Sequence, residues 1–162
     1  MKVKEKNGEH PFGDAGQLIL FTLFLIVWIA DSFFLRRSTL LSDDIPLYFR
    51  LVFLGLALVM AAYLSISGHD VVGPEPCGTK VVSSGAFRYV RHPLYLGCLL
   101  FYLALAVSTA SIFSFALFVL IFVFYNYIAS YEERWLDEKF GEEYRRYRKR
   151  TGKWMPRISK GS

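Results

Sequence analysis

The sequence has little cysteine and little charge, and each shortage excludes a class of protein. Its 162 residues include only 2 Cys, Cys77 and Cys98, whose spacing matches neither a zinc site nor a disulfide framework. We therefore expect both to be structural, and we expect no metal site. Charged residues make up 20% of the chain and hydrophobic residues 54%, including 15 Phe and 10 Tyr. So few charges cannot cover an ordinary soluble surface, and the composition indicates a membrane protein.

The hydropathy pattern predicts an all-α integral membrane protein that forms a single membrane domain over residues 1–162. Four apolar runs approach or reach the length that spans a bilayer, so we expect about four transmembrane helices. The expected spans are residues 15–35, 47–67, 93–107 and 112–131. A short uncharged turn joins the last two, which should therefore form a helical hairpin.

Two further segments complete the expected domain. Residues 68–92 contain several Gly and Pro and predict a structured loop at the membrane surface. Residues 132–150 are strongly charged, yet aromatic and aliphatic side chains recur there at helical spacing. That pattern predicts an amphipathic helix against the membrane surface. The span at 93–107 is short, so it should tilt or begin in the interface, open to a water-filled cavity.

The basic residues predict how the chain is oriented. The net charge is +5, and Lys80, Arg88 and Arg91 lie in the loop while five more cations occupy residues 145–150. Because these cations flank apolar runs instead of forming one extended patch, we expect contacts with membrane lipids and none with nucleic acid. The positive-inside rule places the loop and both termini in the cytoplasm. The pair Arg36 and Arg37 is the exception to this rule, because it lies on the predicted outer side.

The segment Arg91–Gly97 is a candidate binding site because a polar, aromatic loop leads directly into an apolar helix there. Pro93 suits the first position of a helix, and the N–H groups after it are free to hold an anion such as a carboxylate. The charge and hydrogen-bond donors of Arg91 and His92 would add to that attraction. In the alternative interpretation, His92 only caps the helix and Tyr95 is an interfacial anchor.

A second candidate is Glu132, which lies where the fourth apolar run ends. It shares a helical stripe with Leu136 and Phe140, so its carboxylate should lie on a packed face and need a partner. A cationic or hydroxylated ligand is one such partner, and a loop arginine such as Arg88 or Arg91 is the other. The neighbouring Glu133 is rotated away on the helix and is expected to be solvated.

Taken in order, these motifs resemble a known family. Arg-His-Pro-x-Tyr-x-Gly spans residues 91–97, Glu-Glu-x-x-Leu spans 132–136, and Phe-Gly-x-x-Tyr-x-x-Tyr spans 140–147. Together they are similar to the isoprenylcysteine carboxyl methyltransferases and to related bacterial and archaeal membrane methyltransferases. The resemblance covers about residues 79–157, and the first two helices match only as generic spans.

The resemblance implies an enzyme that uses S-adenosyl-L-methionine. Such an enzyme works by positioning and desolvation, so no catalytic side chain is expected. The loop would contribute backbone contacts, the start of the third helix would contribute its His-Pro-x-Tyr motif, and the last helix would contribute a carboxylate. The implied cofactor-binding residues are Lys80, Val81, Val82, Phe87, His92, Pro93, Leu94, Tyr95 and Glu132.

The methyl acceptor is expected to be a lipophilic small molecule that enters from the membrane. Prenylcysteine-methylating members have an Arg one helical turn before the Glu, where this chain has Ile128. An apolar residue there favours a neutral or weakly acidic acceptor over an isoprenylcysteine-like carboxylate. Tyr125, Ile128 and Arg91 are the candidates on the acceptor side. The resemblance also implies a prokaryotic inner membrane location, and no obligatory protein partner is inferred.

Two other functions remain open from the sequence. Membrane sterol reductases have similar C-terminal regions but bind NADPH, and titration with each cofactor would distinguish the two enzymes. A small helical scaffold without catalytic activity is the other alternative. Such a scaffold would lack both cofactor affinity and a polar cavity at His92 and Glu132.

Overall fold

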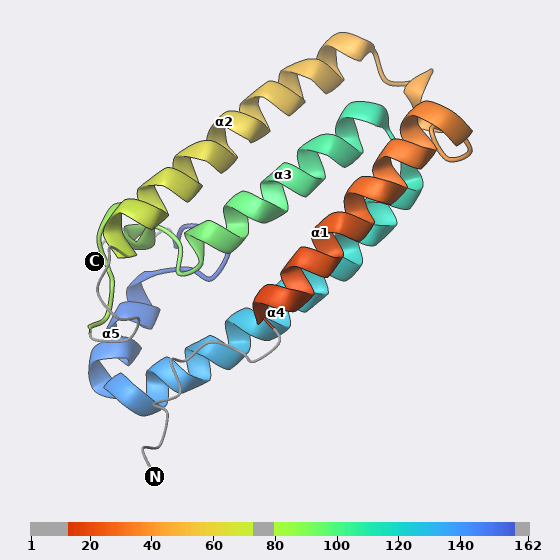
Figure 1. Cartoon of the computed structure of the whole chain (residues 1–162). Coiled ribbons are helices and arrows are strands. Elements are labelled where there is room, and N and C mark those ends of the chain that lie inside the picture. The colour runs from red at the N-terminus through yellow and green to blue at the C-terminus, as the bar shows by residue number, and fades with distance from the viewer. Residues whose placement is uncertain (1–12, 73–79, 158–162) are drawn as a thin grey trace.

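The computed structural model describes residues 13–72 and 80–157, and within these ranges it is all-α, as predicted (Figure 1). Its extended backbone pairing there is limited to an isolated bridge between Val90 and Gly152. Part of the expected loop, residues 73–79 with Cys77, lies outside the described residues. The elements are α1 (Gly13–Ile29), η1 (Ala30–Leu35), η2 (Leu40–Ser42), α2 (Leu47–Val72), η3 (Gly85–Arg88), α3 (Pro93–Thr109), α4 (Ile112–Phe140) and α5 (Glu142–Arg150).

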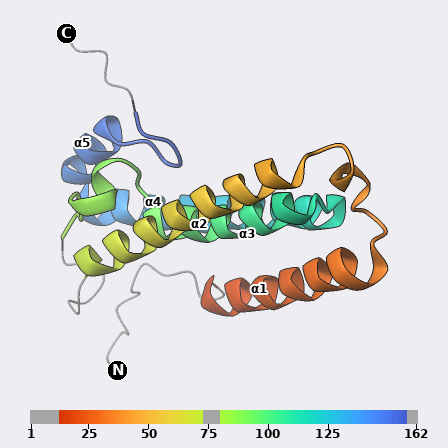
Figure 2. The same ribbon diagram turned by 90° about the horizontal axis from the view of Figure 1, so that it is seen from above.

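The four long helices alternate in direction, with α2 along one side of α3 and α4 along another, and with α1 against α4 (Figures 1 and 2). This arrangement gives the bundle two distinct ends. At the turn end, Ala110 and Ser111 connect α3 to α4, and the segment from α1 leads into α2. At the opposite end, called the site end below, α3 begins and α4 continues into α5.

Three helical stretches are long and apolar enough to cross a membrane: Gly13–Leu35, Leu47–Val71 and Ile112–Phe140. The helix α3 has 17 residues. It is therefore about 26 Å long, somewhat short of a typical hydrocarbon core. Large apolar side chains on the outside of the bundle are exposed, as expected for surfaces that face lipid. The predicted hairpin of a short third helix and a long fourth helix is present.

The boundary expected between the last span and the amphipathic helix lies elsewhere. We expected a membrane helix over residues 112–131 and a separate helix over 132–150, but α4 continues without interruption to Phe140. The residues from Glu132 to Lys139 include no helix breaker, so the change from apolar to charged composition does not end the helix. The break falls at Gly141, whose φ of +51° is readily adopted only by glycine. The amphipathic segment is therefore divided between α4 and α5.

The packing of α2 against α3 depends on small residues. A Cβ atom added at Gly97 of α3 would lie 2.7 Å from the Ser65 hydroxyl oxygen and 3.0 Å from the Ala61 carbonyl oxygen of α2. Such a close approach of two backbones is typical of helix packing within membranes. It places α3 in the centre of the bundle, where its other faces pack on Phe24 of α1 and Ile121 of α4.

A buried carboxylate holds the turn end together. Asp31 lies in the π-helical segment η1 with 2% of its surface exposed. Its carboxylate accepts hydrogen bonds from the backbone N–H groups of Arg37 (3.2 Å) and Ser38 (3.1 Å), from the Ser38 hydroxyl and from the Ser111 hydroxyl (2.6 Å). Since Ser111 also accepts from the Ser114 N–H, one cluster joins η1 to the N-terminus of α4.

Candidate active site

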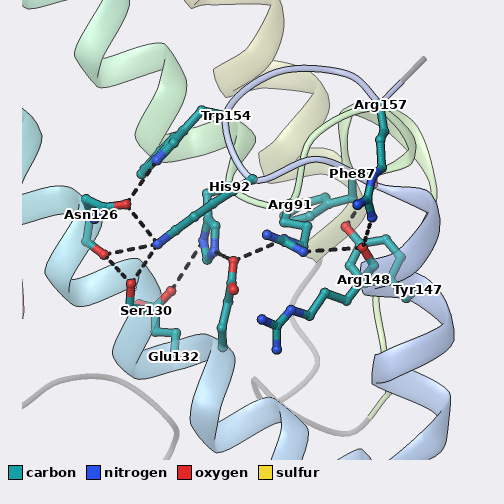
Figure 3. Close-up of polar contacts among 12 residues, drawn as sticks. Phe87, Arg91, His92, Asn126, Ser130, Glu132, Tyr147, Arg148, Trp154 and Arg157 are labelled. Carbon is teal, nitrogen blue, oxygen red and sulfur yellow. Dashed lines mark hydrogen bonds and ion pairs between the residues drawn. The ribbon is translucent and has the colours of Figure 1, made fainter. Parts of the chain in front are cut away.

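The site end gathers side chains from the loop, from α4 and α5, and from the chain after α5 (Figure 3). Tyr95 of α3 also reaches this group through Glu132. The loop reaches this position because Gly85, with a φ of +57°, turns it against α2, where any Cβ would lie 2.7 Å from Val71. Two hydrogen bonds then hold the backbone of the loop. The Tyr147 hydroxyl donates to the Phe87 carbonyl (2.8 Å), and the Arg91 N–H donates to the Gly152 carbonyl (2.9 Å). The segment before α3 is therefore bracketed by α2 on one side and by α5 with the chain after it on the other.

His92 immediately precedes α3 and is buried, with 8% of its surface exposed. Its Nε2 lies 3.1 Å from Oε1 of Glu133. Burial lowers the pKa of His92, and the hydrogen bond and charge of Glu133 only partly oppose that effect. The ring is therefore neutral near pH 7. Because a carboxylate only accepts, the proton lies on Nε2 and leaves Nδ1 as a hydrogen-bond acceptor.

Glu132 lies on the other side of the imidazole, and its side chain is 22% exposed. The Tyr95 hydroxyl donates to Oε1, while Oε2 lies 3.7 Å from the His92 Nδ1 atom. The rings of His92 and Tyr95 are nearly parallel, with centroids 5.6 Å apart. The His92 Nδ1 atom and the Glu132 carboxylate therefore both contribute acceptor atoms to the site. The expectation that Glu132 lies on a packed face is confirmed.

The expectation that Glu133 is solvated is wrong. Only 8% of its surface is exposed, and its Oε1 lies 3.0 Å from the Arg91 Nε atom as well as 3.1 Å from His92. Helical periodicity placed Glu133 on an outer face of α4, but the loop and the chain after α5 fold over that face. The ion pair with Arg91, which the sequence offered as an alternative for Glu132, belongs to Glu133 instead.

A cavity of about 140 Å³ opens at this point. Its lining in the described part of the chain is Phe87, Arg91, His92, Pro93, Leu94, Tyr95 and Glu132. Six of the nine residues that the resemblance implied for cofactor binding therefore share one cavity, together with Arg91 from the acceptor-side candidates. This convergence is what the sequence predicted for His92, Tyr95 and Glu132.

The remaining candidates lie elsewhere. Val81 lines a separate hollow of about 550 Å³ beside α5, Lys80 is exposed, and Val82 is half-buried. Tyr125 is 2% exposed and packs edge-on against Tyr95, with ring centroids 5.3 Å apart. Ile128 is 1% exposed and is not among the residues that line the cavity. Tyr125 therefore borders the site through Tyr95, whereas Ile128 belongs to the core of the bundle.

The residues present fit the charge pattern of S-adenosylmethionine. The start of α3 has no side-chain cap, so its first N–H groups suit a carboxylate, while Glu132 and the aromatic ring of Phe87 suit positive charge. The volume fits less well, because ligand pockets usually measure about 300–1,000 Å³. A cavity of about 140 Å³ has room for only part of such a molecule.

A group of residues that the sequence motifs did not indicate supports His92 from the C-terminal side (Figure 3). The Trp154 ring lies 5.8 Å from the His92 ring, and its indole N–H donates to the Asn126 side chain (3.2 Å). The Lys153 ammonium donates to the same side chain (2.9 Å) and to the Ser130 hydroxyl (2.7 Å). The available signal was the polarity of Asn126 and Ser130 within an apolar run, since polar residues in a membrane span usually have a specific partner.

The fold and the site together define a class: a helical membrane protein with a polar, aromatic cavity at one end of its bundle. Residues 47–143, more than half of the chain, match the family described as phospholipid methyltransferase. The chain therefore belongs to this family, which agrees with the methyltransferase resemblance of its motifs.

Three relatives are each similar to more than half of the chain. Methanethiol S-methyltransferase 1 of Bradyrhizobium diazoefficiens is 35% identical over 54% of this chain and 30% of its own length. Methanethiol S-methyltransferase of Pseudomonas deceptionensis is 30% identical over 67% of this chain and 44% of its own length. Protein-S-isoprenylcysteine O-methyltransferase of Schizosaccharomyces pombe is 33% identical over 56% of this chain and 39% of its own length. The chain thus spans less than half of each relative, and no solved structure matches it.

Proposed function

We propose that this chain is a membrane-embedded methyltransferase that moves a methyl group from S-adenosylmethionine to a lipophilic small molecule, with a thiol as the preferred class of acceptor. The observation that carries the proposal is the cavity that joins Phe87, His92, Tyr95 and Glu132 at the start of α3. Membership of a methyltransferase family and two relatives named for methanethiol S-methylation support it.

The cavity residues have distinct parts in this proposal. When bound, S-adenosylmethionine supplies an electrophilic methyl carbon on a sulfonium. The N–H groups at the start of α3 would hold its carboxylate, and the Glu132 carboxylate with the His92 Nδ1 atom would hold its ammonium. The ring of Phe87 lines the cavity and offers an aromatic face to positive charge.

Positioning by buried groups explains why no nucleophilic side chain is required. The His92 ring is held by Glu133 through Nε2, by the parallel ring of Tyr95 and by the tilted ring of Trp154, so Nδ1 has a defined direction. Tyr125 supports Tyr95 from within the bundle. This arrangement orients the donor and excludes water, which are the main contributions a protein makes to an in-line methyl transfer.

The acceptor preference follows from the charges around the cavity. Arg91 is the only cation among the described lining residues, and its Nε is already paired with Glu133 at 3.0 Å. Ile128, one helical turn before Glu132 in α4, is uncharged. An acceptor with a permanent carboxylate would therefore lack a dedicated partner in a site of low dielectric constant. A neutral thiol avoids that cost.

An isoprenylcysteine carboxylate is the second candidate acceptor. The yeast relative is named for methylation of that group. Arg91 lines the cavity and would be its partner, at the cost of the pair with Glu133. This acceptor requires Arg91 to exchange one carboxylate for another, whereas a thiol leaves the pair intact.

Two measurements test the proposal. Saturating S-adenosylmethionine should stabilise the purified protein, by about 2.7 kcal/mol at 100 times its Kd, and NADPH should not. With radiolabelled donor, transfer to methanethiol should exceed transfer to a small farnesylated cysteine. Stabilisation by NADPH alone would favour the reductase alternative, and stabilisation by neither cofactor would favour the scaffold. Faster transfer to the farnesylated cysteine would overturn the acceptor preference but leave the donor in place.

A further inference from the structure

A second hollow at the site end is lined almost entirely by cations. Its volume is about 520 Å³, and no acidic residue contributes to its described lining. We call it the basic hollow; its lining is Arg91, Arg145, Arg148, Lys149, Thr151, Gly152, Lys153 and Arg157. Arg91 also lines the cavity at His92, so the two spaces adjoin.

Most of this positive charge is not neutralised within the described part of the chain. Arg145 pairs with Asp137 (3.0 Å) and Glu142 (2.9 Å), and Arg91 pairs with Glu133. The other four cations of the hollow, Arg148, Lys149, Lys153 and Arg157, have no carboxylate within 4.0 Å among the described residues. A concave site with surplus positive charge attracts anions.

The walls of the hollow are held in place by backbone contacts. The Arg157 guanidinium donates to the Lys149 carbonyl (2.9 Å) at the C-terminus of α5. Gly152 accepts from the Arg91 N–H (2.9 Å) and forms the bridge with Val90. The segment 151–157, called the strap below, is thereby fixed against both α5 and the loop. Its lysine and arginine are presented by a defined backbone and not by a free tail.

The position of the strap places the basic hollow beside lipid. The Lys153 ammonium reaches Asn126 and Ser130 of α4, and the Trp154 ring lies 5.7 Å from that of Phe122. Asn126 and Phe122 are exposed on the outer surface of α4, a helix long and apolar enough to cross a membrane. A tryptophan at this level is typical of the headgroup region. The hollow therefore opens where a phospholipid would place its headgroup.

We propose that the basic hollow binds the phosphate of an anionic phospholipid, whose acyl chains lie along the exposed apolar surface of α4. Arginine and lysine recognise phosphate by charge-assisted hydrogen bonds, and anionic headgroups attract each interfacial cation. The lipid binds next to the methyltransferase cavity at Arg91 and is not the methyl acceptor. The inference depends on the charges and position of the strap, and it holds whether or not the proposed reaction is correct.

The test compares lipid binding by the full chain in detergent with and without two of these cations. Dioctanoyl phosphatidylglycerol should bind the wild type, and dioctanoyl phosphatidylcholine, with the same chains but no net charge, should bind much more weakly. In the double variant Arg148→Gln/Lys149→Gln the affinity for phosphatidylglycerol should fall about 25-fold, since each interfacial cation contributes roughly a fivefold factor. The backbone carbonyls that hold Arg157 remain in this variant.

The matched control is Arg146→Gln/Arg150→Gln, which removes the same charge from the same helix but from the hollow lined by Val81. It should retain most of the affinity. An equal loss in both double variants would overturn the proposal, because nonspecific surface charge would then explain the binding. Equal binding of the two lipids, or complete displacement by millimolar inorganic phosphate, would also overturn it. If the double variant does not fold, Lys149→Gln alone should lower the affinity about fivefold.

Discussion

Carboxylates lie at both ends of the bundle, but their surroundings differ. At the turn end, Asp31 is 2% exposed and accepts four hydrogen bonds from protein donors. At the site end, one oxygen of Glu132 accepts from Tyr95, while the other faces an acceptor, the His92 Nδ1, in a cavity. A carboxylate surrounded by donors holds structure together. A carboxylate that lines a cavity is placed to contact a ligand.

The site end repeats this comparison between neighbouring residues. Glu133 resembles Asp31, because Arg91 and His92 cover the side of Glu133 that would otherwise face solvent. Only 8% of its surface remains exposed. Glu132, one residue earlier, lines the cavity. Two adjacent carboxylates of α4 therefore have different surroundings, and identical substitutions at the two positions separate a structural role from a ligand-binding role.

The largest expected effect is a loss of stability from a substitution at the turn end. Asp31→Ala should lower the free energy of unfolding by about 3 kcal/mol, because it leaves buried donors from Arg37, Ser38 and Ser111 without their acceptor. Chemical denaturation in detergent measures this loss. The Kd for S-adenosylmethionine, measured on the folded protein, should be unchanged. A change in Kd with little loss of stability would contradict the structural role of Asp31.

Glu133→Gln should have the next largest effect on stability, a loss of about 2 kcal/mol. The substitution keeps the shape of the side chain but removes the charge that Arg91 and the His92 N–H face. The denaturation measurement is the same. If Glu133→Gln proved as stable as the wild type, the buried pair with Arg91 would not contribute to folding as the geometry indicates.

Glu132→Gln is expected to show the opposite pattern. Cofactor affinity should fall about tenfold, as expected for the loss of one charged contact, while the free energy of unfolding changes by less than about 1 kcal/mol. Isothermal titration with S-adenosylhomocysteine and denaturation of the same sample separate the two quantities. If Glu132→Gln lost stability and kept its affinity, Glu132 and Glu133 would have exchanged roles and the site assignment would fail.

A smaller effect, on pH dependence, comes from His92. Burial lowers the pKa of His92 below its ordinary value of 6.5, with Glu133 acting in the opposite direction. As the pH falls below 6.5 the unfolded chain binds the proton first, so stability is full above this pH and decreases toward the lower pKa of the folded state. His92→Gln should show a shallower decrease between pH 6.5 and 5. A steeper decrease in the variant would mean that His92 is charged in the folded protein.

The candidate site was predictable where a single helix or one helix start determined it. Pro93 begins α3 as its position in the motif indicates, and Glu132 does contact the residues at the start of α3. The error at Glu133 has a different origin. The turn at Gly141 and the strap decide which outer face of α4 becomes covered. The strap begins more than ten residues after the end of α4.

The contacts of the strap also could not be predicted from the sequence pattern. Lys153 and Trp154 follow the recognised motifs and have no periodic pattern, so nothing local connects them with His92. Asn126 is 27 residues from Lys153 in the sequence, yet it accepts hydrogen bonds from both Lys153 and Trp154. Its polarity within an apolar helix indicates that a partner exists, but not which one.

The sequence by itself determined the apolar helices, the short third span and the polar segment that begins it, because these follow from the length of hydrophobic runs and from Pro93 at a helix start. Tertiary structure alone decided which carboxylate is paired, which cations form the basic hollow and what supports His92. Those outcomes depend on contacts between distant segments around Gly141 and Gly152. Helical periodicity assigns a residue to a face, but only the packing of other segments decides whether that face meets lipid, water or protein.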